Sequence, residues 1–219
     1  MKQVNFVIDA RKEYEYQKLF QKVSWLNKMS LFTYTPIDNK SRIIRKIESF
    51  WDDEDREIVK KIEKEWRTIE KDYFKLVQEI TGIEWLYDEY FAYFLALSPV
   101  IGFSNPYNFK SQEIALTPSA IINPRFIVGH ELFHSHYYYL VDKLGMTKNA
   151  NRTIFTEGIA ALMLFKTSMK DLFPNTDFQS SINYYPQVAK AWDTLVKIWE
   201  KRTSFKNFLE EVITSLPQR

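Results

Sequence analysis

Hydrophobic residues recur at intervals of three and four along much of the chain, which is the spacing that places them on one face of an α-helix. Ile58, Ile62, Trp66 and Ile69, for example, follow this spacing among charged residues. The pattern predicts helices over residues 9–28, 43–51, 53–80, 125–144 and 153–169, and two more near residues 186–201 and 204–216. Most of the chain is therefore expected to be helical.

Segments typical of β-strands are fewer and shorter. Hydrophobic positions alternate over residues 4–8 and 83–87, residues 90–97 are rich in strand-forming types, and residues 113–117 form another short run. Pro, Gly and Asn between residues 99 and 108 indicate turns or a loop. The sequence predicts the α+β fold class, mainly helical, with a small mixed β-sheet.

The pattern changes near residue 82, where Thr81 and Gly82 end the helix predicted over residues 53–80. Residues 1–81 are predicted to form a helical N-terminal region that packs on the rest of the chain. Residues 82–219 are predicted to form the core, with the sheet and the C-terminal helices. Because no Gly/Ser-rich linker separates these regions, we expect one continuous α+β unit.

Charge and hydropathy argue against two classes of partner. The formal net charge is +2 and no block of Lys or Arg stands out, so we expect no nucleic-acid partner. The most apolar stretch, residues 90–103, is shorter than the roughly 20 residues that span a bilayer, so we expect no membrane span. The N-terminal residues lack the apolar run of a signal peptide, and the expected location is cytoplasmic.

Composition restricts the chemistry that the chain can perform. The 219 residues include no Cys, which excludes disulfides, thiolate metal sites and a Cys nucleophile. Only five Gly are present, which disfavours a Gly-rich phosphate-binding loop. A transition-metal site would have to come from carboxylates and the three His.

All three histidines lie within residues 130–136, whose sequence is HELFHSH. On a helix, His130 and His134 are four residues apart and lie one turn above one another, so both imidazoles can reach one ion. Glu131 flanks the same face and can take a proton from metal-bound water without being a ligand. His136 points about 200° away from His134 on an unbroken helix, and we predict ordinary hydrogen bonding for it rather than a ligand role.

Such a site needs a third protein ligand. Glu157 is the one acid near the start of an otherwise apolar helical segment with the sequence TEGIAAL. An acid there can also simply be stabilised by the helix dipole, but beside an H-E-x-x-H motif we favour Glu157 as the third ligand. Gly158 would let a second helix approach closely.

The H-E-x-x-H motif followed by a helix that bears Glu-Gly resembles the gluzincin clan of zinc metallopeptidases. The uncharged residues at 127–129 and 132–133 fit the clan's wider pattern, and the similarity covers roughly residues 110–170. It implies a zincin-like fold with the sheet packed on the H-E-x-x-H helix, Zn²⁺ bound by His130, His134 and Glu157, and Glu131 as general base. The implied activity is hydrolysis of a peptide or protein substrate.

The resemblance also implies how a substrate would bind. In the clan, an edge strand ahead of the first motif helix binds the peptide main chain, and residues 113–117 occupy the matching place. The substrate-binding candidates are therefore Ile114, Ala115 and Leu116. Tyr184 and Tyr185 are the candidates for stabilising the oxyanion.

Several features depart from the clan's pattern. Ala161 stands where thermolysin-like members carry an Asp beside the zinc ligands, and position 136 is usually apolar. No sequence resembles the G-x-M-E-N motif of the clan's aminopeptidases, which favours endopeptidase activity.

Alternatives to an active zinc peptidase remain open at this point. The chain can be a catalytically inactive metal-binding relative that acts in regulation or protein interaction, and residues 1–81 can dock a partner or cover the site. Two His and a carboxylate also suit non-heme iron, although the Glu of the motif favours zinc hydrolysis. The natural substrate and the oligomeric state are not predicted.

Overall fold

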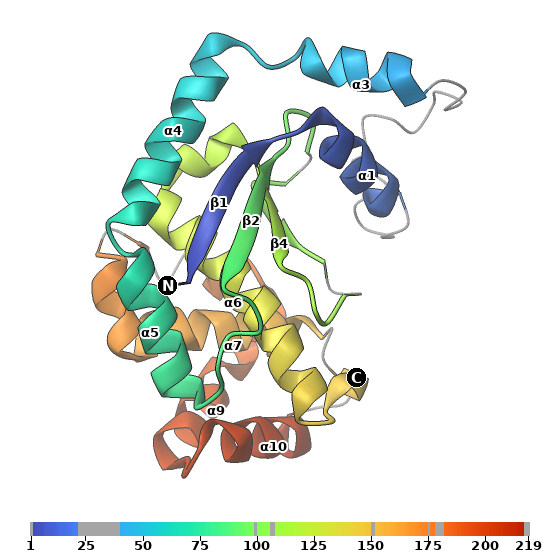
Figure 1. The fold of residues 1–219 in the computed structure, drawn as a ribbon. Helices are drawn as coiled ribbons and strands as arrows, with labels where there is room; N and C mark the ends of the chain where they lie inside the picture. Colours follow the sequence, from blue (N-terminus) through green and yellow to red (C-terminus); the bar gives the residue numbers. More distant parts are fainter. Residues whose placement is uncertain are drawn as a thin grey trace.

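The computed structural model describes residues 2–21, 40–98, 100–105, 108–149, 152–174, 176–177 and 182–216. It contains a four-stranded sheet in the order β1-β2-β4-β3 (Figure 1). The strands are β1 (Gln3–Ile8), β2 (Glu89–Phe94), β3 (Gly102–Ser104) and β4 (Glu113–Leu116). The strands β1, β2 and β4 run parallel and β3 runs antiparallel to β4, so the predicted small mixed sheet is confirmed.

Helices make up most of the described chain, as the sequence predicts. The α-helices are α1 (Ala10–Phe20), α3 (Lys40–Glu48), α4 (Asp53–Arg67), α5 (Glu70–Thr81), α6 (Pro124–Lys143), α7 (Thr153–Lys166), α9 (Pro186–Lys201) and α10 (Phe205–Ser215). Short 3-10 helices are η1 (Pro118–Ile122), η2 (Thr147–Asn149) and η3 (Ser168–Leu172). In the part of the chain described, no helix is both long enough and apolar enough to cross a membrane.

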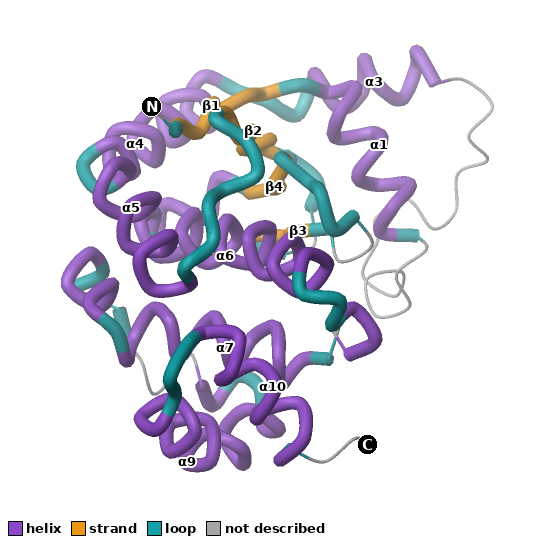
Figure 2. The backbone as a smooth tube through the Cα atoms, turned by 60° about the horizontal axis from the view of Figure 1, so that its bottom comes forward, coloured by secondary structure: helices purple, strands orange, loops and turns teal. Residues whose placement is uncertain are grey.

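The helix α6 lies at the centre of the molecule. It packs against β3 and β4 on one side and against α7 on the other, so α6 separates the sheet from the C-terminal helices α7, α9 and α10 (Figure 2). Most of its residues are buried, which is why its sequence is apolar on several faces rather than on one stripe. The other face of the sheet is partly covered by α1, through Tyr16 and Phe20.

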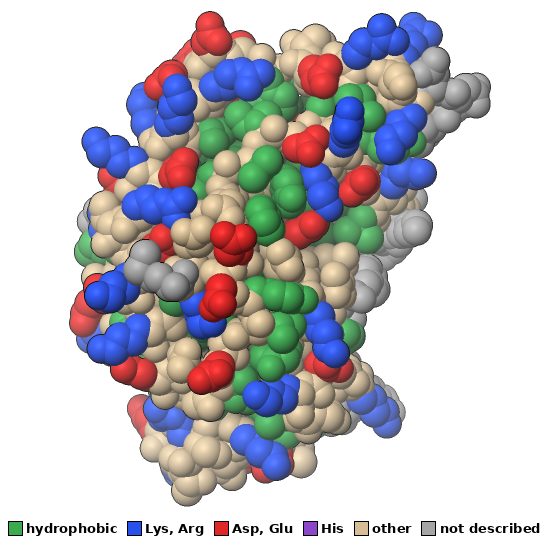
Figure 3. Space-filling model, viewed as in Figure 1, with side chains coloured by type: hydrophobic (Ala, Val, Ile, Leu, Met, Phe, Trp, Pro, Cys, Tyr) green, Lys and Arg blue, Asp and Glu red, His purple; other side chains and the backbone are tan. Residues whose placement is uncertain are grey.

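The strand β1 joins the N-terminal region to the rest of the fold. It pairs with β2 along all of its residues, from Gln3 opposite Glu89 to Ile8 opposite Phe94. Residues on either side of position 82 therefore share one sheet. Over the face drawn in Figure 3, hydrophobic side chains gather above this sheet, basic and acidic side chains are mixed around them, and no histidine is visible.

The predicted single helix over residues 53–80 is wrong, because the chain forms two helices with a break at Thr68 and Ile69. Thr68 Oγ1 donates to the carbonyl of Glu65 at 2.6 Å, and Ile69 is the residue that precedes α5. The hydrophobic stripe continues across the break without Gly or Pro, so it contains no stop signal. The turn directs the Glu70 carboxylate into the core.

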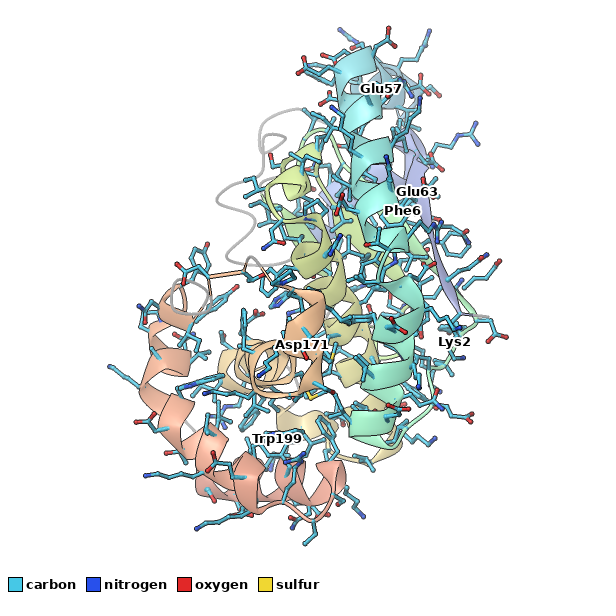
Figure 4. All side chains as sticks on the ribbon, turned by 90° about the vertical axis from the view of Figure 1, so that its left-hand side faces the viewer. Lys2, Phe6, Glu57, Glu63, Asp171 and Trp199 are labelled. Carbon is cyan, nitrogen blue, oxygen red and sulfur yellow. The ribbon has the colours of Figure 1, made fainter. Side chains whose placement is uncertain are left out.

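Glu70 attaches the edge strand β1 to this turn. Its Oε1 accepts hydrogen bonds from Val4 N at 2.7 Å and from Trp66 Nε1 at 2.9 Å. Arg67 pairs with Glu70 and also with Glu63, and its guanidinium lies over the ring of Phe6. Figure 4 shows Phe6 of β1 beside Glu63 of α4. The carboxylate thereby satisfies main-chain and side-chain donors that the core would otherwise leave unpaired.

Replacing Glu70 with Ala is expected to lower the free energy of unfolding by about 2–4 kcal/mol, because buried donors at Val4 and Trp66 lose their acceptor. Urea denaturation measures this difference. The Glu63→Ala variant is the matched control, since it removes the exposed carboxylate on the same Arg67 and should cost less than about 0.5–1 kcal/mol. Equal losses in both variants would contradict the role assigned to Glu70.

Two further predictions need correction or restriction. The alternating residues 83–87 do not form a strand, because Trp85 is buried against Phe74 and its Nε1 donates to the Phe74 carbonyl. The helix predicted over residues 9–28 is found as α1, and residues 22–28 of that prediction lie outside the described residues.

Candidate metal centre

The structure brings together the three residues that the sequence singles out as ligands. His130 and His134 lie one turn apart on α6, and Glu157 lies in the first turns of α7. The two Nε2 atoms are 2.9 Å apart, and they lie 3.1 Å and 3.3 Å from the two carboxylate oxygens of Glu157. Ligand atoms of a tetrahedral zinc ion at 2.0–2.1 Å are about 3.3 Å apart, so the residues present fit such an ion.

The charges of these three side chains shift one another's pKa values. Burial raises the pKa of Glu157, but His134 and His130 outweigh burial and hold this pKa well below its usual value. Burial lowers the pKa of His134, but the Glu157 charge outweighs it and raises the pKa. An ionised carboxylate thus faces two imidazole nitrogens at the interface of two helices, and this donor set suits a divalent cation.

Close packing holds the two helices in position. Tyr73 of α5 donates a hydrogen bond of 2.5 Å to the carbonyl of Gly129, directly before His130. A Cβ on Gly129 would lie 3.0 Å from atoms of Tyr73 and Phe173, so this part of α6 has little room for a side chain. On α7, a Cβ on Gly158 would lie 2.9 Å from Leu195, so the helix that approaches Gly158 closely is α9.

On the side away from Glu157, the two imidazoles pack against aromatic rings. Among the described residues, neither Nδ1 of His130 nor Nδ1 of His134 has a hydrogen-bond partner. The His130 ring lies 5.6 Å from that of Phe126, and the His134 ring is stacked 6.3 Å from that of Tyr138. Ala161, at the position where thermolysin-like enzymes have an Asp, is buried and offers no acceptor. This absence distinguishes the site from a thermolysin-like one.

Glu131 lies beside the three candidate ligands and is itself buried. Its pKa is raised by burial, and the neighbouring His134 and His130 offset part of this effect. Ser104 of β3 lies 2.9 Å from its Oε2 atom. The Glu131 carboxylate thus lies near the candidate metal group without belonging to it, and its role as a proton acceptor stays a prediction.

His136 lies apart from the site, as its angle on the helix predicts. It is 1% exposed, its Nε2 is 3.2 Å from Thr81 Oγ1, and its ring lies over Trp85 with centroids 4.3 Å apart. Burial lowers its pKa to about 3, so the ring is neutral at pH 7. Its role is to fill the space between α6 and the segment that follows α5.

We expect His136→Ala to lower the free energy of unfolding by about 2 kcal/mol or more, because it leaves a cavity beside Trp85 and removes a buried partner of Thr81. Metal stoichiometry should not change, since His136 is not part of the group formed by His130, His134 and Glu157. Chemical denaturation and elemental analysis of the same preparation measure the two quantities. Loss of metal with unchanged stability would contradict this assignment.

The prediction that residues 113–117 form an open edge strand is wrong. The strand β4 has β2 on one side and β3 on the other, so the main chain of Ile114, Ala115 and Leu116 is already paired and these residues are buried. The edge of the described sheet on this side is β3, in a segment that the sequence indicates as loop. Three residues are too few for a periodic pattern, so the sequence carried no strand signal there.

The free side of β3 can be assigned from its pairing. Thr117 N donates to the carbonyl of Ile101 at 2.9 Å, so Ile101 and Phe103 direct their main-chain groups toward β4. The main-chain groups of the alternate residues, Gly102 and Ser104, point to the other side. They have no strand partner within the described sheet.

The two candidate tyrosines differ in position. Tyr185 precedes α9, is partly buried, and lies close enough to Glu157 for their charges to interact. Burial, together with the Glu157 and Glu131 charges, raises its pKa well above the usual range, so the hydroxyl keeps its proton. Tyr184 is 77% exposed and stacks edge-on against Tyr185. Of the two, Tyr185 is the one that lies near the candidate metal group.

Searches with this chain find no matching family model, no matching curated protein and no matching solved structure. The functional interpretation therefore depends on the site geometry.

Proposed function

We propose that this protein is a zinc-dependent hydrolase that cleaves peptide bonds in a peptide or protein substrate. The observation that carries the proposal is the convergence of His130, His134 and Glu157 from two helices, with the buried carboxylate of Glu131 beside them. Catalytic zinc sites have three protein ligands and a nearby carboxylate, whereas structural zinc sites have four protein ligands.

In this proposal each residue has a separate task. Zinc, when bound by this set, lowers the pKa of a coordinated water to about 7 and polarises a carbonyl oxygen. Glu131 takes the proton of the attacking water on its carboxylate and then passes it to the leaving amine nitrogen. His130, His134 and Glu157 would hold the ion, and the partial exposure of His130 and Glu157 leaves the site open to water and substrate.

Two neighbouring features support a peptide substrate. An extended peptide can pair with the free main-chain groups of Gly102 and Ser104 on β3, which lies against the motif helix. The protonated Tyr185 hydroxyl near Glu157 can donate a hydrogen bond to the carbonyl oxygen as negative charge develops there. Tyr184 is too exposed for the same task.

The direct test measures hydrolysis of a panel of internally quenched peptides by the full-length protein, with and without a chelator. We expect cleavage at internal bonds that is lost with chelator and restored by stoichiometric Zn²⁺ but not by Fe²⁺. Elemental analysis gives the metal identity. A protein that retains zinc but cleaves none of the panel would favour the alternative, a catalytically inactive metal-binding relative with a regulatory role.

A further inference from the structure

Two residues of β3 contact the side chain of Glu131. Ser104 and Glu131 are both buried, with 7% and 8% of their surface exposed. Ser104 Oγ lies 2.7 Å from the main-chain oxygen of Glu131 and 2.9 Å from its Oε2. The single Oγ–H is shared between these two acceptors of the same residue, and this three-centre contact restricts the side-chain torsions that lie between them.

Gly102 provides the space in which the carboxylate lies. A Cβ built on Gly102 would be 2.6 Å from Glu131 Oε1 and 2.7 Å from its Cγ, closer than Cβ contacts in proteins allow. Any larger residue at position 102 would displace the Glu131 side chain. Ser104 and Gly102 thus act on opposite oxygens of one carboxylate, since the first binds Oε2 and the second leaves room for Oε1.

The orientation that results is relevant to the proposed reaction. Glu131 directly follows His130 on α6 and interacts electrostatically with His134, His130 and Glu157, so it lies near the candidate metal group. Its Oε2 is held by Ser104, whereas no hydrogen bond from another described residue reaches Oε1. Ser104 and Gly102 therefore fix the position of both carboxylate oxygens beside this group.

We propose that Ser104 is a positioning residue for Glu131 and that Gly102 keeps the matching space open. This inference rests on the proposed function, in which Glu131 is the general base. Proton transfer requires the acceptor oxygen within hydrogen-bond reach of the reacting water, and small displacements of the acceptor lower the rate strongly. The edge strand β3 thus orients the base in addition to offering its main chain to a peptide.

The activity test compares Ser104→Ala, Gly102→Ala and the matched control Ser111→Ala in zinc-loaded full-length protein. Ser111 is equally buried, but its hydroxyl bonds to the main chain of Glu113 rather than to Glu131. We expect kcat to fall about tenfold in Ser104→Ala, the loss of one hydrogen bond to a charged group, and further in Gly102→Ala. KM, zinc stoichiometry and the Ser111→Ala rates should stay within about twofold of wild type, a small effect on this scale.

A second measurement does not depend on activity. The unfolding equilibrium of Ser104→Ala, Glu131→Ala and the double variant forms a cycle that measures the coupling of the two side chains. We expect the effect of Ser104→Ala on the unfolding equilibrium constant to shrink about tenfold when Glu131 is already Ala. A merely structural serine would have the same effect in both backgrounds.

The outcomes separate this inference from the proposed function. If wild type cleaves peptides but Ser104→Ala is as active as Ser111→Ala, the positioning role is wrong. If wild type cleaves nothing, the proposed function fails and the unfolding cycle alone decides whether Ser104 holds the Glu131 carboxylate. Absence of coupling in that cycle overturns the inference in either case.

Discussion

The His134→Ala variant is expected to bind no zinc under conditions in which the wild-type protein binds about one ion per chain. Removing His134 leaves one nitrogen and one carboxylate, and a catalytic zinc ion takes three protein ligands. The positions of His130 and Glu157 are also less restricted without His134, because its Nε2 lies 2.9 Å from His130 Nε2 and 3.3 Å from Glu157 Oε1. Elemental analysis after gel filtration, with the zinc content expressed per chain, measures the effect.

His136→Ala is the matched control for this prediction. It removes the same type of side chain from the same helix, two residues away, and it should keep one zinc ion per chain because His136 packs on Trp85. Glu157→Ala should behave like His134→Ala if the ligand group spans α6 and α7. Unchanged zinc in His134→Ala and in Glu157→Ala would remove the basis of the proposed metal centre.

The Glu131→Gln variant is expected to keep its zinc ion and to lose about 100- to 10,000-fold in kcat. Gln has nearly the same shape and can still accept a hydrogen bond from Ser104, but its amide cannot take up a proton at neutral pH. The site geometry and the metal stoichiometry should therefore persist while proton transfer is lost. Rates on a fluorogenic peptide, measured beside zinc content, check both parts.

An exposed carboxylate serves as the control. Glu89→Gln changes a surface residue at the start of β2 and should leave both zinc content and kcat unchanged. Substantial hydrolysis by a zinc-loaded Glu131→Gln protein would show that another group takes the proton, and it would also remove the reason for positioning by Ser104. Loss of zinc in this variant would instead assign Glu131 a ligand role.

Helical spacing explains how much of the site the sequence predicts. His130 and His134 are brought together by local geometry alone, because residues four apart on any helix lie on the same face. The same geometry separates His136 from them, and the structure places His136 against Thr81 and Trp85. Glu157 was indicated by its residue type and by the gluzincin resemblance, and its 3.1 Å approach to His130 depends on the packing of α7 against α6.

The sequence by itself determined the mainly helical α+β class, the short helical window that holds every histidine, and the residues able to bind a metal, because these depend on periodicity and composition. The tertiary structure decided the break between α4 and α5, the position of β3 at the sheet edge in place of β4, and the contact of Ser104 and Gly102 with Glu131. Each of these depends on partners distant in the chain, such as Val4 for Glu70 and Glu131 for Ser104. Patterns within a single segment carry no information about such partners.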